Sequence, residues 1–246
     1  MQKPGHTRNC LPHDHLRQTS NTFIRTPLPG LTRGMAIVHA APTLGTGFAM
    51  MTVEFEPGGV LTKSTAQRLI YVIEGELQMH GSDSRHPVLR AGYFAYLSAR
   101  DSHSLIARDK TRAIVIEKTC KLRGSSQNMY QETPHSLVGD EAATTAGMLN
   151  EDEGVEVRAL LPSSLGFNFA LSTMTYEPGA SLPQVEVHHM ELGLLVLEGG
   201  GIYRLGDAWY HASAGDFIWI APFCPLWFGC VGKVPAKYLI YQDFNG

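Results

Sequence analysis

The sequence lacks long hydrophobic runs and dense clusters of basic residues. No stretch approaches the roughly 18 apolar residues that a membrane-spanning helix needs, and the polar N-terminus does not resemble a signal peptide. The 246 residues include 20 Lys and Arg against 23 Asp and Glu, a formal net charge of -3. Without a basic cluster, attraction to nucleic acid or anionic lipid is weak. We therefore expect a cytoplasmic protein with neither nucleic acid nor membrane as a partner.

Cysteine motifs and nucleophile motifs are also missing. The four cysteines, Cys10, Cys120, Cys224 and Cys230, have no CxxC spacing, and a chain of this length does not need disulfides to fold. We expect reduced, structural thiols. No GxSxG motif is present, and no local signature pairs a cysteine with a histidine. The "HDH" stretch at 13–15 contains metal-ligand residue types, but we expect solvated side chains in such a polar arm.

An internal repeat is present instead. The first half contains "TVEFEPGGVL", "RLIYVIEGELQM", "AGYFAYLSARDSHSL" and "AIVIEK", and the second contains "TMTYEPGASL", "GLLVLEGGGIYRL", "AGDFIWIAPFCPLW" and "YLIYQD". Landmark residues recur 121 to 124 positions apart: Pro57 and Pro178, Gly75 and Gly199, Gly92 and Gly215. The repeat indicates two copies of one structural unit.

Each copy has the pattern of an antiparallel β protein. Short runs rich in Val, Ile, Leu, Tyr, Phe and Trp alternate with Pro-Gly, Glu-Gly and Ala-Gly turns. Such strands avoid exposed edges by closing into a barrel or jelly roll. We predict an all-β chain in four segments, with an extra strand at 155–162: an arm with first strands at 1–44, an N-terminal barrel at 45–120, a linker and connecting strand at 121–165, and a C-terminal barrel at 166–246.

These motifs resemble the two motifs of the cupin superfamily, and two copies imply a bicupin, that is, two tandem double-stranded β-helix (jelly-roll) barrels. The sequence from "GLLVLEGG" to "YLIYQDFN" is similar to the C-terminal half of the (S)-ureidoglycine aminohydrolase family. "RTPLPGLTRGMAIVHAAPTLGTGFAM" and "RLIYVIEGELQM" resemble its N-terminal half. The resemblance covers nearly the whole chain after about residue 23. It implies a manganese-dependent enzyme of ureide and purine nitrogen catabolism, which releases ammonia from ureidoglycine.

The resemblance also assigns site residues. It places the metal in the C-terminal barrel, bound by a Glu, a His two residues later, a second His four further on, and a Gln after the next apolar strand. Glu186, which is also the candidate catalytic carboxylate, and His188 match the first two positions. Leu192 and Leu226 occupy the other two.

Two substrate-binding positions also follow from the resemblance. Tyr203 is retained, and Gln242 stands where the family has a lysine expected to hold the substrate carboxylate.

Strand alternation provides an independent test. If Glu186 and His188 point into the barrel on one strand, then Met190 and Leu192 do too, while His189 and Glu191 face outward. A carboxylate and an imidazole suit manganese, iron or zinc, but such ions normally need three or more protein ligands. The two leucines would make the cavity drier and more apolar.

The N-terminal barrel offers an even poorer metal site. Applying the repeat offsets, Glu186 and His188 fall opposite Thr62 and Ser64, Leu192 falls opposite Arg68, and Leu226 falls opposite His103. This barrel supplies one imidazole and no carboxylate. We expect His103 to be a hydrogen-bonded histidine near a strand end rather than a metal ligand.

Two functions stay open from the sequence. One is a ureidoglycine aminohydrolase-type hydrolase acting on a C–N bond with manganese. The other is a non-catalytic bicupin that binds a small molecule or serves as an assembly module. In both cases we expect a homo-oligomer, because barrels with apolar strand faces commonly associate.

Overall fold

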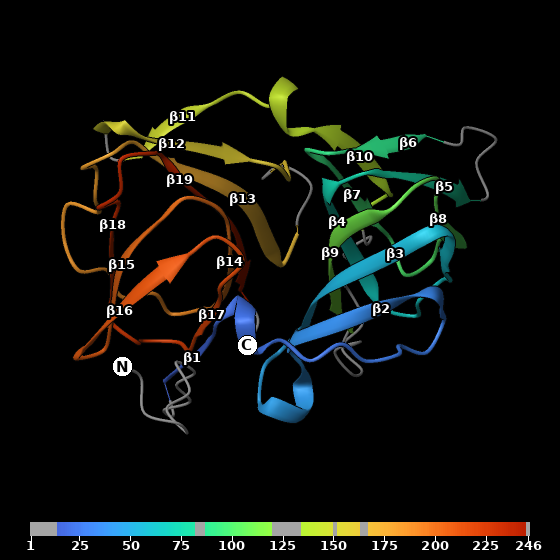
Figure 1. Cartoon of the computed structure of the whole chain (residues 1–246), viewed down its shortest axis with the longest axis horizontal. Helices are drawn as coiled ribbons and strands as arrows, with labels where there is room; N and C mark the ends of the chain where they lie inside the picture. Colours follow the sequence, from blue (N-terminus) through green and yellow to red (C-terminus); the bar gives the residue numbers. More distant parts are fainter. Residues whose placement is uncertain (1–13, 82–86, 120–133, 150–151, 163–166, 245–246) are drawn as a thin grey trace, which may run out of the picture. The chain divides into compact units, whose positions relative to one another are not determined.

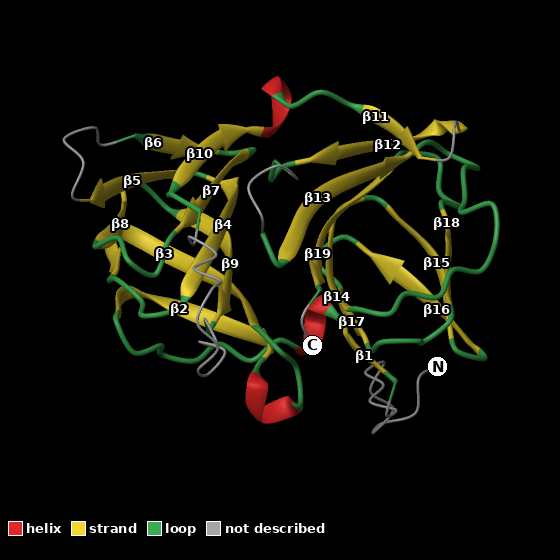
Figure 2. Cartoon of the chain, turned by 180° about the vertical axis from the view of Figure 1, so that it is seen from behind, coloured by secondary structure: helices red, strands yellow, loops and turns green. Residues whose placement is uncertain are grey.

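The chain is almost entirely β-strand in the computed structural model, which describes residues 14–81, 87–119, 134–149, 152–162 and 167–244. In these ranges the helical segments are three single 3₁₀ turns, η1 (Ser20–Thr22), η2 (Pro42–Leu44) and η3 (Glu141–Ala143) (Figure 2). No helix in the described part is long and apolar enough to cross a membrane. The predicted all-β fold is confirmed.

The chain forms two compact units, each assembled from segments that are separated in the sequence. The C-terminal barrel comprises Met1–Phe23, Thr145–Leu161 and Asn168–Gly246, and the N-terminal barrel comprises Ile24–Thr144 and Pro162–Phe167. This division differs from the four predicted segments in two ways. The arm at 1–44 is shared between the two units, and the region predicted as a linker contributes strands to both. Local composition does not reveal which barrel a polar segment joins.

The N-terminal barrel is built on one curved sheet. Its strands follow the order β10 (Leu137–Asp140), β7 (Tyr93–Leu97), β4 (Gln67–Glu74), β9 (Thr111–Lys118), β3 (Ala49–Leu61), β8 (His103–Ala107), β5 (Glu76–Gly81) and β6 (Val88–Arg90), and β2 (Leu31–Ala40) pairs with β3. The inward apolar faces of these strands form one buried cluster, which is the core of this barrel.

The C-terminal barrel repeats this arrangement in two sheets. The larger has the order β1 (His15–Gln18), β17 (Phe217–Ile220), β14 (Glu191–Glu198), β19 (Ala236–Asp243), β13 (Phe169–Tyr176), β12 (Asp152–Ala159) and β11 (Gly147–Leu149). The smaller has the order β16 (Ala208–Ser213), β15 (Gly200–Leu205) and β18 (Leu226–Gly229). β12 confirms the extra strand predicted at 155–162.

The strand register shows that the two copies are structurally equivalent. In the N-terminal barrel Arg68 on β4 pairs with Glu117 on β9. In the C-terminal barrel Leu192 on β14 pairs with Gln242 on β19. Leu192 was expected to correspond to Arg68 from the sequence offset of 124, and the register confirms this. Gln242 corresponds to Glu117.

A glycine ends the central strand of each copy for the same physical reason. Gly75 and Gly199 follow β4 and β14 with φ of 80° and 64°, in the left-handed region that L side chains disfavour. A Cβ on Gly75 would lie 2.5 Å from the carbonyl oxygen of Lys110, and one on Gly199 would lie 2.1 Å from that of Pro235. The Glu-Gly turns therefore need glycine for both conformation and space.

The N-terminal arm completes the C-terminal barrel. β1 pairs antiparallel with β17, so the blue β1 lies beside the orange β17 in Figure 1. His15 on β1 is only 3% exposed, and its Nε2 lies 2.9 Å from the hydroxyl of Tyr210. The expectation that 13–15 are solvated is therefore wrong for His15, because strand pairing buries it. His13 lies outside the described residues, as do Cys10 and Cys120.

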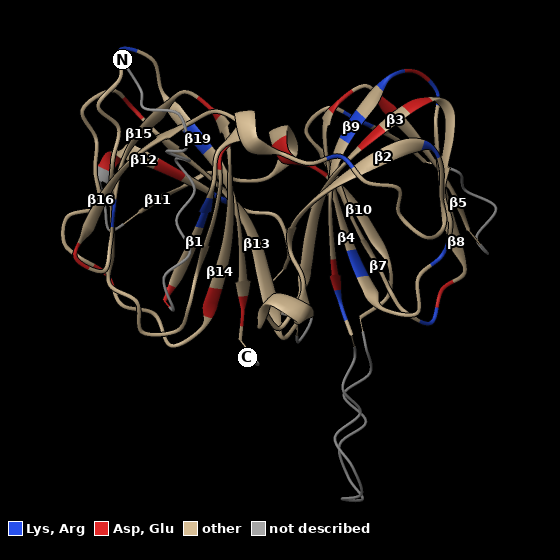
Figure 3. Ribbon diagram, turned by 60° about the horizontal axis from the view of Figure 1, so that its bottom comes forward, with Lys and Arg blue, Asp and Glu red and all other residues tan. Residues whose placement is uncertain are grey.

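Charged residues of both signs are interspersed over the described strands of each barrel (Figure 3). Several form ion pairs, including Arg25 with Glu54 and Arg90 with Glu76.

Candidate functional site

Glu186 lies directly beside Leu226 at one end of the C-terminal barrel. The two residues form an isolated antiparallel bridge, in which each backbone N–H donates to the other's carbonyl oxygen at 2.8 and 2.9 Å. The strand expected through 186–192 is present only from Glu191. The backbone N–H of Phe223 donates to the carbonyl of His188, so this segment follows the β17–β18 loop instead of a continuous ladder.

The two retained ligand-type side chains contact each other. His188 Nε2 lies 3.1 Å from Glu186 Oε2, and the side chains are 29% and 24% exposed. A zinc or manganese ion has ligand distances of about 2.0 to 2.2 Å to nitrogen and oxygen, so two atoms at this spacing can share one ion. The two side chains therefore lie together, and their role as metal ligands stays a prediction.

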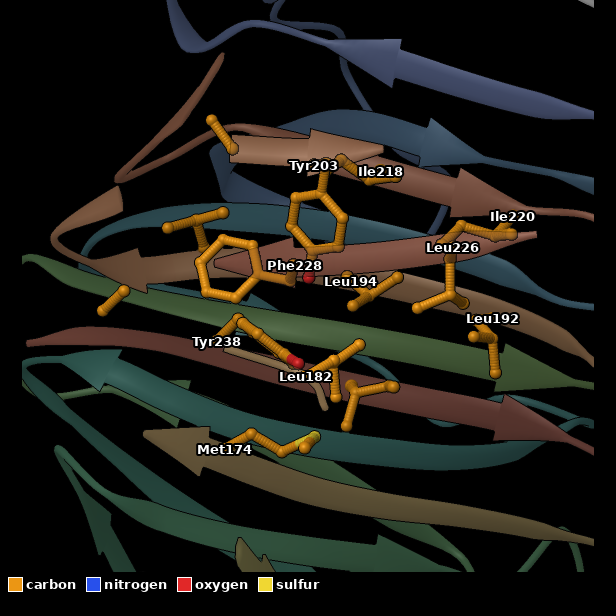
Figure 4. Close-up of a cluster of buried hydrophobic side chains, with 14 of the residues drawn as sticks. Met174, Leu182, Leu192, Leu194, Tyr203, Ile218, Ile220, Leu226, Phe228 and Tyr238 are labelled. Atoms are coloured by element: carbon orange, nitrogen blue, oxygen red, sulfur yellow. The ribbon is translucent and has the colours of Figure 1, made fainter. Parts of the chain in front are cut away.

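Leu192 and Leu226 fill the remaining ligand positions with buried hydrocarbon. They are 1% and 6% exposed and belong to the apolar cluster inside the C-terminal barrel. Figure 4 shows them next to Ile220 at one end of this cluster. Neither side chain offers a ligand atom. Both leucines belong to the same packed cluster, and a cavity shared by them stays a prediction.

The neighbours of the pair follow strand alternation with one exception. Met190 packs against the barrel cluster, and His189 is exposed, as predicted. Glu191 is not part of this cluster, but it is buried, with only 4% of the residue exposed. Its Oε2 accepts a hydrogen bond of 2.8 Å from the indole N–H of Trp219, which satisfies the buried carboxylate.

Tyr203 places a hydroxyl inside the barrel. The residue is 1% exposed, and its ring lies 4.6 Å from that of Phe228 and 6.3 Å from that of Tyr238. Its hydroxyl makes no hydrogen bond of standard geometry with the described residues. Burial, and secondarily the nearby Tyr176, raise the pKa of Tyr203 well above its usual value. The group is therefore a protonated donor at neutral pH.

Tyr238 is a buried residue that the sequence analysis did not single out. Its hydroxyl lies 2.9 Å from that of Tyr176, and its pKa is raised well above the usual value by burial, by Tyr203 and, to a smaller degree, by Glu186. Alternation on β19 could have identified it, because Tyr238 and Gln242 lie on the same face of that strand.

Gln242 is partly buried and pairs with Leu192 on β14 and with Ala170 on β13. The position predicted for the substrate carboxylate is thus beside one of the two leucines. A neutral carboxamide at this point can donate and accept hydrogen bonds but carries no charge.

The equivalent place in the N-terminal barrel holds an ion pair. Arg68 is 4% exposed and donates to Glu117 Oε1 at 2.6 and 2.9 Å and to the carbonyl of Thr62 at 2.8 Å. His103 Nε2 lies 3.3 Å from Arg68, and its Nδ1 lies 3.2 Å from the carbonyl of Asp101. Burial and then Arg68 lower the pKa of His103. The prediction of a hydrogen-bonded His103 near a strand end is confirmed, and its having no metal-ligand role stays a prediction.

Two surface depressions lie away from the Glu186–His188 pair. One, of about 440 Å³, is in the N-terminal barrel and is lined by Thr62, Lys63, His80, Gly81 and 102–104. The other, of about 450 Å³, is in the C-terminal barrel and is lined by 178–181, Trp227 and 229–232. Glu186 and His188 line neither of them.

Comparison with known proteins identifies the family. The family model described as "Cupin domain" matches residues 172–241. The chain is 36% identical over 246 residues to (S)-ureidoglycine aminohydrolase of Arabidopsis thaliana, covering 98% of this chain and 80% of that protein. The chain belongs to the (S)-ureidoglycine aminohydrolase family.

Solved structures show the fold of this ureidoglycine aminohydrolase-like chain. A Pseudomonas aeruginosa protein described as glyoxylate-induced superposes with a TM-score of 0.86 at 24% identity, covering 100% of this chain and 94% of that one. An oxalate decarboxylase of Bacillus subtilis superposes with a TM-score of 0.72 at 12% identity, covering 96% of this chain and 79% of that one. The bicupin architecture predicted from the repeat is confirmed.

Proposed function

We propose that this chain is a hydrolase of the ureidoglycine aminohydrolase type, in which water replaces an amino group of a ureide and the amino group leaves as ammonia. Membership of the family supports this proposal. The observation that carries it is the contact between Glu186 and His188, which keeps two ligand-type side chains 3.1 Å apart in the C-terminal barrel.

Glu186 and His188 fit a divalent ion in part, and we propose manganese. They supply one carboxylate oxygen and one imidazole nitrogen, and solvent or substrate must complete the shell because Leu192 and Leu226 have no ligand atoms. An ion held there would supply positive charge that polarises the substrate and lowers the pKa of a bound water. With two protein ligands the affinity is expected to be weak.

The remaining residues of the site bind and shield the substrate. The unpartnered hydroxyl of Tyr203 is protonated and can donate a hydrogen bond to a ureide oxygen. The carboxamide of Gln242 can hydrogen-bond a carboxylate or a urea group of the substrate. Leu192 and Leu226 exclude water from one side, which strengthens these hydrogen bonds.

A second candidate function is favoured by the same two leucines. Their burial makes the interior next to Glu186 apolar, and an apolar, dry pocket suits binding of a small molecule without chemistry. In this function Tyr203 and Gln242 orient the ligand, and the Glu186–His188 hydrogen bond is structural.

Ammonia release from ureidoglycine, measured with and without added manganese, tests the first function. The unmodified chain is expected to release ammonia in a manganese-dependent manner, and Glu186→Gln and His188→Ala are each expected to abolish it. His189→Ala is the matched control, because this exposed neighbour points away from the site. Unchanged turnover in either site variant would contradict the assigned site.

Metal analysis and a ligand screen test the second function. A protein that purifies without a transition metal, does not bind added manganese and is stabilised against heat by ureides or organic acids would support the small-molecule-binding function.

Cytoplasmic location and homo-oligomerisation stay predictions.

A further inference from the structure

A second group of metal-ligand side chains lies outside the Glu186–His188 pair. Asp14 and His15 come from the start of β1, and Cys224 comes from the loop between β17 and β18. One donor atom from each of the three lies within 4.8 Å of the others. Backbone pairing fixes the two segments together, because the N–H of Ala221 donates to the carbonyl of Asp14 at 2.9 Å.

The spacing of the three side chains suits one tetrahedral ion. His15 Nδ1 lies 2.9 Å from Asp14 Oδ1, and Cys224 Sγ lies 3.7 Å from Asp14 Oδ2. Around zinc, with bonds of about 2.0 to 2.3 Å, neighbouring ligand atoms are separated by about 3.3 to 3.8 Å. Binding an ion therefore requires that the His15–Asp14 hydrogen bond open by a few tenths of an ångström and that the three donor atoms, which lie within 4.8 Å of one another, adjust around the ion.

The orientation of His15 is already that of a metal-binding imidazole. The residue is 3% exposed, and its Nε2 is 2.9 Å from the hydroxyl of Tyr210, whose ring packs edge-to-face at 5.3 Å. Metal-binding histidines usually bind the ion through one ring nitrogen and donate from the other to such a partner. Here Nδ1 faces Asp14 and Cys224 while Tyr210 holds Nε2.

The charge and exposure of Asp14 leave the group open to a cation. Asp14 is half exposed, with 47% of its side chain accessible, which leaves a route for an ion. The nearby Arg17 lies 3.6 Å from Asp216 and donates to the carbonyl of His211, so its charge is directed elsewhere.

We propose that Asp14, His15 and Cys224 form a zinc site that ties the N-terminal strand β1 to the C-terminal barrel. A thiolate, an imidazole and a carboxylate with one open position for water are a donor set for zinc, whereas manganese prefers oxygen ligands. Binding releases the thiol proton. The site is independent of the function proposed for Glu186 and His188.

Cobalt binding to the full-length protein tests this site. After removal of metals by a chelator, Co²⁺ is titrated and the thiolate-to-cobalt absorption band is recorded, followed by competition with Zn²⁺. We expect one equivalent of Co²⁺ to produce the band and Zn²⁺ to abolish it. Saturating Zn²⁺ is expected to raise the Tm by about 5 °C.

Matched variants make the result specific. Cys224→Ser and Cys224→Ala are expected to lose the band, and Asp14→Asn is expected to weaken Co²⁺ binding at least tenfold. Cys230→Ala, at a buried thiol that donates to the carbonyl of Val234, should keep the band. A double variant with Glu186→Gln and His188→Ala should also keep it. Absence of the band in the unmodified protein, or its persistence in Cys224→Ala, would overturn the proposal.

Discussion

Two buried leucines determine the chemistry of the C-terminal barrel at the scale of single residues. Leu226 pairs with Glu186 through the backbone, and Leu192 pairs with Gln242, so each apolar side chain lies directly beside a polar candidate. The polar residues Glu186 and His188 contact each other. In the site that we propose, the two leucine positions supply no ligand atoms while this contact is present.

Replacing the two leucines with ligand residues should raise the affinity for manganese if the backbone holds the new side chains in the right places. The triple variant Leu192→His, Leu226→Gln and Gln242→Lys is expected to bind manganese at least tenfold more tightly than the unmodified chain, measured by calorimetric titration. Leu194→His is the matched control, because Leu194 is buried in the same cluster but is not one of the positions that the family resemblance assigns to metal ligands. It should cost stability without raising affinity. Equal affinities of the triple variant and the unmodified chain would show that the pocket is remodelled beyond its ligands.

His39 gives a prediction on pH and stability. It is fully buried, its Nε2 is 2.8 Å from Thr52 Oγ1, and burial lowers its pKa from 6.5 to about 3. As the pH falls, the unfolded chain protonates His39 at a higher pH than the folded chain does. The contribution of the neutral, buried His39 to stability is therefore complete above about pH 6.5 and is lost as the pH falls toward 3. The loss amounts to about 1.4 kcal/mol per unit of pKa difference.

Urea unfolding at several pH values tests this assignment. His39→Gln is expected to be less stable at neutral pH but to lose less stability between about pH 6.5 and 3 than the unmodified chain. His189→Gln is the control, because an exposed histidine leaves this slope unchanged. The same pH slope in His39→Gln and in the unmodified chain would contradict the role of His39.

At the scale of elements, glycine turns and edge strands define each barrel. The turn after β14 brings Gly199 against the backbone of Pro235, and the same turn recurs after β4. The outer edges of β17 and β7 are covered by β1 and β10, which come from outside the repeated motifs. Covering these edges protects the sheets from pairing with other chains.

The turn after β14 should tolerate no side chain. Gly199→Ala is expected to destabilise the protein by about 2 to 4 kcal/mol, because it adds a collision with the carbonyl of Pro235 to the strain of positive φ. Gly179→Ala is the matched control, since Gly179 has φ of 90° but no atom within 4 Å of an added Cβ. It should cost only about 1 kcal/mol. Thermal or urea unfolding measures the loss of stability in both variants. Equal losses would mean that the structure around Gly199 shifts and relieves the collision.

At the scale of the whole molecule, duplication has produced two barrels with one architecture and different interiors. The position equivalent to Leu192 is Arg68, which forms an ion pair with Glu117 and contacts His103. One barrel thus holds a buried ion pair where the other holds apolar side chains. Family membership covers both barrels, and the retained ligand pair lies in the C-terminal one.

The sequence by itself determined the all-β fold, the repeat, and the positions of Glu186, His188, Leu192 and Leu226. The strands and turns follow from local rules, because strands alternate their faces every residue and tight turns need glycine. The resemblance to the family assigned the four site positions, and the offsets of the repeat located Arg68 and His103 as the equivalents in the other barrel.

Only the tertiary structure decided which barrel receives β1, that His15 is buried, and that Tyr238 packs against Tyr176 and Tyr203. His15 and Tyr210 are 195 positions apart in the sequence, and their contact depends on strand pairing between distant segments. Local composition carries no signal for such pairing, because a short polar segment has the same composition whether it is solvated or paired with a barrel strand. The exchange of segments between the two barrels has the same cause.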